Sequence, residues 1–97
     1  MQIHVLPDPV GTHDDTYRYV DRAIAEITRS GLTYEVGALG TTVEGPADAV
    51  WALARRVHDA TKDPSTRRVM TLIKVYESTD DATSMKSLTA AHRPANP

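Results

Sequence analysis

Thr42 and Glu44 are the two residues of this 97-residue chain best placed to do chemistry together. They lie in the run Thr41-Thr42-Val43-Glu44, which has the length and composition of a short strand. Because side chains alternate between the two faces of a strand, a hydroxyl and a carboxylate share one face. Such a pair can hydrogen-bond a polar ligand or attract a cation.

Two stop signals position this pair. Gly37 and Gly40 flank Ala38-Leu39 and predict a two-residue hairpin turn before the strand, because glycine tolerates the positive φ of such turns. Gly45-Pro46 ends the strand and starts a helix. The polar face of the strand therefore lies between a hairpin turn and a helix start.

Other side chains are expected near the pair or behind it. His4 and Lys74 alternate onto the face of Glu44, so the three groups are predicted to converge, as a binding or proton-transfer site or, more commonly, as ion pairs. Tyr34 alternates toward the core, but its hydroxyl needs a partner, so it could line a pocket between sheet and helices. Trp51 is expected in the core with the apolar stripe of its helix.

The composition argues against several functional classes. A net charge of −2 gives no reason to expect nucleic acid as a partner. The absence of Cys removes thiolate metal sites and fits a cytoplasmic location, and no apolar run approaches the roughly 20 residues that span a bilayer. No dinucleotide or phosphate-loop motif occurs, and no two histidines have metal-ligand spacing. No catalytic residue, metal or cofactor is predicted.

Apolar periodicity predicts the order β-α-β-β-α-β, with strands at 2–6, 32–38, 41–44 and 67–77. One helix starts after Thr12, Asp14 or Asp15, any of which can cap it, and ends at Ser30-Gly31; a second runs from Pro46 to about residue 61. This order predicts an α+β ferredoxin-like sandwich, with both helices on one face of an antiparallel sheet of order 4-1-3-2. It forms one domain over 1–78, and 79–97 is an extension with a short helix near 85–92.

The other face of this sheet is left open. Its polar side chains are those of the candidate site together with Glu35, and its apolar ones include Leu6, Met70, Leu72 and Tyr76. Apolar surface of this kind is costly in water, so the face is expected to bind another subunit, or the tail.

The residues around the hairpin carry a family resemblance. The run Ser30-Gly31-Leu32-Thr33-Tyr34-Glu35-Val36-Gly37, followed by Gly40-Thr41-Thr42-Val43-Glu44-Gly45, resembles the core of the small thiamine-binding proteins of the YkoF-like family. The first strand, the second helix and the last strand resemble that family as well, whereas the first loop and the polar tail depart from it. The resemblance implies a ferredoxin-like fold and homo-oligomers, dimers or tetramers, built by packing open sheet faces. It also implies binding of thiamine or its hydroxymethylpyrimidine moiety without turnover.

On this resemblance the ligand-binding residues are expected to be Tyr34, Thr41, Thr42 and Glu44, with His4. A carboxylate such as Glu44 can grip the ring and amino nitrogens of an aminopyrimidine, and acidic and aromatic surroundings favour a cationic thiazolium. Two alternatives stay open. The chain could be an oligomeric structural or regulatory module without a small ligand, or a small α+β barrel enzyme whose pocket lies between two open sheets.

Overall fold

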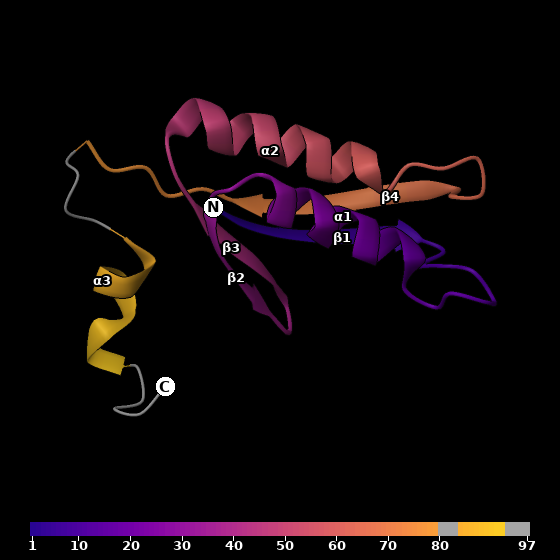
Figure 1. Cartoon of the computed structure of the whole chain (residues 1–97), viewed down its shortest axis with the longest axis horizontal. Helices are drawn as coiled ribbons and strands as arrows, with labels where there is room; N and C mark the ends of the chain where they lie inside the picture. The colour runs from indigo at the N-terminus through magenta and orange to yellow at the C-terminus, as the bar shows by residue number, and fades with distance from the viewer. Residues whose placement is uncertain (80–83, 93–97) are drawn as a thin grey trace.

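Alternating apolar residues in the strands and apolar stripes on the helices build a two-layer structure (Figure 1). The computed structural model describes residues 1–79 and 84–92. Its sheet is antiparallel with order β2-β3-β1-β4, which is the predicted order read from the other edge, so the ferredoxin-like α+β fold is confirmed. The elements are β1 (Gln2–Asp8), α1 (Arg18–Arg29), β2 (Thr33–Gly37), β3 (Gly40–Glu44), α2 (Ala47–Ala60), β4 (Arg68–Lys74), α3 (Met85–Thr89) and the 3-10 turn η1 (Ala90–His92).

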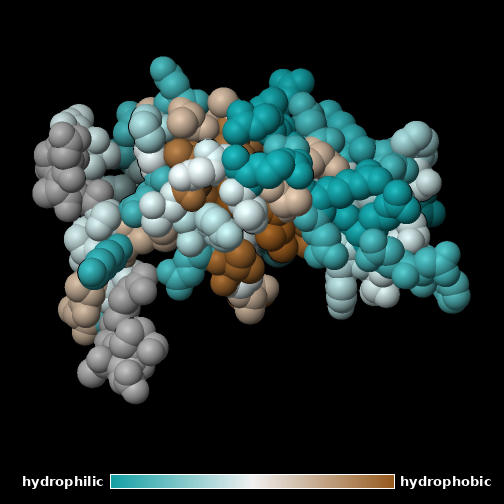
Figure 2. Space-filling model, in the orientation of Figure 1, coloured by the Kyte–Doolittle hydropathy of each residue, from teal (hydrophilic) through white to brown (hydrophobic). Residues whose placement is uncertain are grey.

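The core lies between the sheet and the α1–α2 layer. Ile3 of β1 and Val43 of β3 point from the sheet into this layer, where Ile27 of α1 and Leu53 of α2 meet them. Each of these side chains is at most 3% exposed. Burying a side chain of this size contributes roughly 1.5–3 kcal/mol. In Figure 2 apolar side chains gather near the middle of the visible face, and hydrophilic ones cover the end where the β1–α1 and α2–β4 loops lie.

The predicted hairpin turn is present at Ala38-Leu39. Gly37 pairs with Gly40. The backbone φ of Gly40 is 132°, a value that residues other than glycine rarely adopt. A Cβ at Gly40 would also lie 3.1 Å from the carbonyl oxygen of Ile3 on the neighbouring strand. The turn fixes the register of β2 against β3.

Two expectations about the helices are wrong. Trp51 is 51% exposed, because the buried stripe of α2 is Val50, Leu53, Ala54 and Val57, and Trp51 lies about 100° around the helix from Val50. The first helix begins at Arg18, later than expected, and has no side-chain cap. Thr12 instead accepts a hydrogen bond from the backbone N–H of Asp15 within the preceding loop (3.1 Å).

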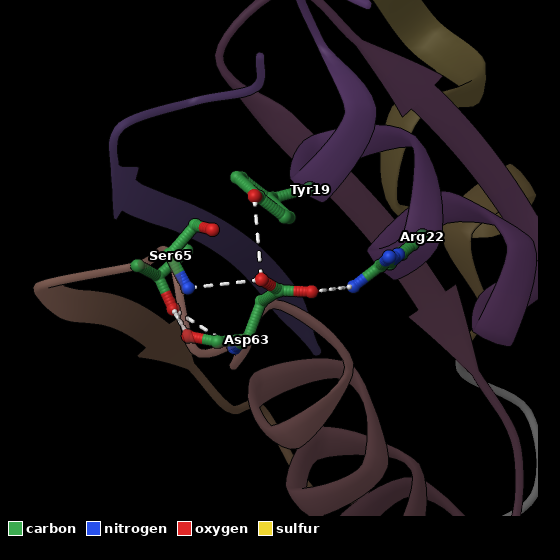
Figure 3. A network of polar contacts seen from close by, with 5 residues as sticks. Tyr19, Arg22, Asp63 and Ser65 are labelled. Atoms are coloured by element: carbon green, nitrogen blue, oxygen red, sulfur yellow. Dashed lines mark hydrogen bonds and ion pairs between the residues drawn. The ribbon is translucent and has the colours of Figure 1, made fainter.

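A polar network ties the start of α1 to the loop after α2 (Figure 3). Asp63 accepts hydrogen bonds from Nη1 of Arg22 (3.0 Å) and from the backbone N–H of Ser65 (2.9 Å), and the hydroxyl of buried Tyr19 points at it from 3.5 Å. The Arg22 guanidinium also lies 5.3 Å from the centre of the Tyr19 ring, so the three side chains contact one another. The network therefore ties α1 to the α2–β4 loop at the end of the molecule that lies away from α3 (Figure 1).

Candidate functional site

A broad hollow lies between the tip of the β2–β3 hairpin and the C-terminal segment, by which we mean residues 84–92. It has a volume of about 680 Å³. Figure 1 shows α3 apart from the α1–α2 layer, on the side of the hairpin. The hollow is lined by Gln2, Glu35, Gly37, Ala38, Leu39, Gly40, Thr42, Met85, Thr89 and His92.

A row of polar side chains crosses the open face of the sheet at this hollow. Thr42 of β3 pairs with Glu35 of β2 on one side and with Gln2 of β1 on the other. Gln2 in turn pairs with Lys74 of β4. Because neighbouring strands lie about 4.8 Å apart, the Thr42 hydroxyl has the Glu35 carboxylate on one side and the Gln2 amide on the other. Together they offer both hydrogen-bond donors and acceptors to a planar polar ligand.

Glu44 lies two residues beyond Thr42 on the same face and holds the C-terminal segment. Its Oε2 accepts a hydrogen bond from the backbone N–H of Met85, the first residue of α3, at 2.8 Å. Ser84 caps the same helix: its hydroxyl accepts from the Ser87 N–H (3.1 Å), and its own N–H donates to the Ser87 hydroxyl (2.8 Å). Glu44 therefore joins the sheet to one side of the hollow.

The start of β1 lies close to Glu44. The Met1 ammonium donates a hydrogen bond to the carbonyl of Val43 at 2.7 Å. Partial burial lowers the pKa of this amino group, and the nearby Glu44 carboxylate, which raises it, offsets part of that effect. The Glu44 carboxylate thus interacts with the Met1 ammonium and also accepts a hydrogen bond from the first residue of α3.

The five expected ligand-binding residues fall on two faces of the sheet. Thr42 lines the hollow and Glu44 borders it. His4 is on the same open face but pairs with Leu72 and is outside the hollow. Thr41 and Tyr34 belong to the helix-covered face, because Thr41 pairs with Ile3 and Tyr34 pairs with Val43. One ligand in this hollow cannot contact all five.

Tyr34 differs most from its expected surroundings. Although it points toward the helix layer, it is 39% exposed, because β2 is an edge strand and all of its residues are exposed. Its hydroxyl lies 3.5 Å from the Thr28 hydroxyl of α1. Thr41, in contrast, is buried. Both residues therefore lie on the face of the sheet that is turned away from the hollow.

The expected convergence of His4, Glu44 and Lys74 is wrong. Since Gln2 pairs with Thr42, His4 and Glu44 lie two residues to opposite sides of that pair, which separates them by roughly 13 Å along the strands. Lys74 is opposite Gln2, so neither His4 nor Glu44 is its direct cross-strand partner. The neighbours of Thr42 are instead Gln2 and Glu35, which were not among the expected ligand residues. The turn could have revealed Glu35, because pairing Gly37 with Gly40 places Glu35 opposite Thr42.

A second, smaller hollow of about 230 Å³ lies on the outer surface of the helices. Its charged side chains are already paired, Arg22 with Asp63 at 3.0 Å and Arg29 with Glu26 at 2.6 Å. It offers a ligand no comparable row of polar groups. We therefore place the candidate site at the hairpin.

Within residues 1–79 and 84–92, no three histidine, cysteine or acidic side chains are grouped closely enough to hold a metal ion. Over the same ranges, every helix is too short or too polar to cross a bilayer.

Several solved structures are similar to this chain. A domain of unknown function (DUF77) from Bacillus cereus has a TM-score of 0.78 at 29% identity, over 95% of this chain and 88% of that one. A hypothetical protein from Methanocaldococcus jannascii, with a TM-score of 0.76 at 23% identity over 93% and 90% of the two chains, shares the fold. A candidate thiamine biosynthesis/salvage protein from Thermotoga maritima has a TM-score of 0.65 at 27% identity, over 95% of each chain.

Sequence comparison gives the family. A UPF0045 protein of Clostridium perfringens is 29% identical over 59 residues, which are 61% of this chain and 62% of that relative, so the match spans less than two thirds of its length. Residues 1–93 match the family described as "Thiamine-binding protein". Because that match covers the whole sheet, both long helices and the C-terminal segment, the chain belongs to the thiamine-binding protein family.

Proposed function

We propose that this chain is a cytoplasmic, non-enzymatic binding protein that takes thiamine or its hydroxymethylpyrimidine moiety in the hollow beside the β2–β3 hairpin. The observation that carries the proposal is the row Glu35, Thr42 and Gln2 along the hollow, in a chain of the thiamine-binding family. Neighbouring carboxylate, hydroxyl and amide groups suit the alternating donors and acceptors of an aminopyrimidine.

The charges and apolar groups around the row also suit this ligand. Glu35 lines the hollow, so a cationic thiazolium would meet an acidic side chain there. Leu39 and Met85 add apolar surface on opposite sides, from the hairpin turn and from α3. A mostly apolar hollow with a few polar groups is the usual form of a small-molecule site.

Adjacent threonines provide a matched test by isothermal titration calorimetry with thiamine and with hydroxymethylpyrimidine. Thr42→Val removes a hydroxyl from the hollow and is expected to weaken binding by about tenfold. Thr41→Val makes the same chemical change on the opposite face, so its affinity should equal that of the wild type. Absence of heat with both ligands in the folded wild-type protein would refute the proposed function, and equal losses in the two variants would refute the location of the site.

We further propose that the chain forms a homo-oligomer, a dimer or tetramer, through the open sheet face. Leu6 and Met70 form a cross-strand pair on this face and are 40% and 62% exposed, and Leu72, beside them, is 52% exposed. Apolar side chains gathered in this way on a sheet face are typical of subunit contacts. This stripe lies over β1 and β4, so it is beside the hollow and need not cover it.

A further inference from the structure

We propose that Glu44 acts on ligand binding as a positioning residue: its carboxylate holds the C-terminal segment in place, and the segment forms a removable side of the hollow. This inference rests on the proposed function, because it assigns part of the same site. It differs from a direct role in which Glu44 grips the pyrimidine.

The C-terminal segment is only lightly attached to the rest of the protein. Helix α3 has five residues, none of them buried, and it packs extensively only against η1. Its one leucine, Leu88, is 58% exposed. A helix of this length does not persist alone in water, because too few hydrogen bonds offset the cost of its first turn. The attachment therefore depends on a few specific contacts.

Glu44 supplies such a contact at the first residue of α3. The N–H of Met85 belongs to the first turn of α3 and so has no acceptor within the helix. The Glu44 carboxylate accepts from it at 2.8 Å, across a sequence separation of 41 residues. A carboxylate at this position also interacts favourably with the positive end of the helix. The Glu44 side chain thus attaches the start of α3 to the sheet and supplies the acceptor that the Met85 N–H lacks within the helix.

The segment forms the side of the hollow that faces the hairpin. Met85 and Thr89 are four residues apart and lie on one face of α3, and His92 follows on η1. All three line the hollow with the polar row of the sheet. When the segment leaves, the hollow loses these residues and becomes an open sheet surface. Because apparent affinity falls with the fraction of molecules in the binding-competent form, affinity depends on the docked population.

Substitutions on the two partners separate this indirect role from direct contact with the ligand. Ser84→Ala removes the capping hydroxyl of α3 and leaves the sheet unchanged. Glu44→Ala removes the acceptor for Met85, whereas Glu44→Gln keeps an acceptor oxygen and removes only the charge. Glu77→Ala, at an exposed position after β4, is the matched control for loss of a carboxylate. Each full-length protein is measured in two ways: backbone NMR order parameters for residues 84–92, and calorimetric titration with hydroxymethylpyrimidine.

We expect order parameters near about 0.85 in the wild type and in Glu77→Ala, and below about 0.6 for residues 84–92 in Glu44→Ala. Ser84→Ala should lower them as well and should weaken binding by about fivefold, although it alters no group of the sheet. Glu44→Gln should retain most of the order and most of the affinity.

Two results would overturn the positioning role while leaving the proposed function intact. One is a wild-type affinity in Ser84→Ala despite a disordered segment. The other is a Glu44→Gln variant that loses binding while its segment stays ordered, which would mean that the carboxylate contacts the ligand. Absence of binding in the wild type would instead refute the proposed function, and with it the inference.

Discussion

Asp63 and Arg22 connect the loop after α2 to α1, with Oδ2 of Asp63 lying 3.0 Å from Nη1 of Arg22. The Ser65 N–H and then the Arg22 guanidinium hold the pKa of the Asp63 carboxyl below its usual value of 3.8, because both stabilise the charged form. The network in Figure 3 thus requires an ionised Asp63. It makes the stability of this end of the molecule depend on pH.

The first prediction is that acid lowers the free energy of unfolding through Asp63. A carboxyl group whose pKa is lowered by folding contributes stability above its unfolded pKa, and that contribution is lost as the pH falls through the folded pKa. We expect the free energy of unfolding to fall below about pH 4, and Asp63→Asn to be less stable at pH 7 but less sensitive to acid. Urea titrations at pH 7 and pH 3 measure both effects. Glu77→Gln removes an exposed charge as a matched control, and its free energy of unfolding should fall between pH 7 and pH 3 as much as that of the wild type. An equal fall in Asp63→Asn would contradict the role of Asp63 in acid sensitivity.

The second prediction compares two leucines in opposite environments. Leu53 is fully buried between α2 and the sheet, whereas Leu39, at the hairpin turn, is 78% exposed. Leu53→Ala leaves a cavity and should lower the free energy of unfolding by about 2–5 kcal/mol. Leu39→Ala removes the same atoms from a solvated position and should change it by less than about 0.5 kcal/mol. Chemical denaturation of both variants checks the position of the core, which a similar cost in the two would contradict.

Tyr34 gives the third prediction, because the family resemblance points to it and the fold places it on the face away from the hollow. Its hydroxyl is 3.5 Å from that of Thr28, which is a long contact for two hydroxyl groups. Tyr34→Phe should therefore change the affinity for hydroxymethylpyrimidine by less than about twofold. Calorimetry beside Thr42→Val tests this. A large loss in Tyr34→Phe would move the site to the helix-covered side of the sheet.

Local patterns in the sequence predict most of the fold. Alternation gives the strands, the stripe of α2 gives the helix, and the glycines that flank Ala38-Leu39 give the hairpin and its register. The exposure of Trp51 could not be predicted in this way, because the residue that follows Val50 lies on the border between the buried and exposed sides of the helix. The apolar period does not say on which side of that border it falls.

The candidate site is predicted less completely, since it combines residues that are far apart in the chain. Gln2 becomes a neighbour of Thr42 only when β1 enters the sheet in its observed register. The contact between Glu44 and Met85 is made across 41 residues, and no periodicity on either segment predicts it. A strand pattern identifies which face Glu44 occupies, but its partner on that face depends on how the C-terminal segment packs.

The last prediction concerns the apolar stripe on the open sheet face. Leu72 lies opposite His4 on this face and is 52% exposed, so a carboxylate there would be buried against apolar side chains wherever two copies pack. Leu72→Glu should convert the proposed homo-oligomer into a monomer at concentrations where the wild type is assembled. Val10→Glu makes a comparable change at a position 43% exposed in the β1–α1 loop and should leave the assembly intact. Sedimentation equilibrium distinguishes the masses, and a wild type that stays monomeric at high concentration would refute the interface. Because the stripe lies over β1 and β4 and the hollow over the hairpin, monomeric Leu72→Glu should still bind the ligand if each subunit holds a complete site.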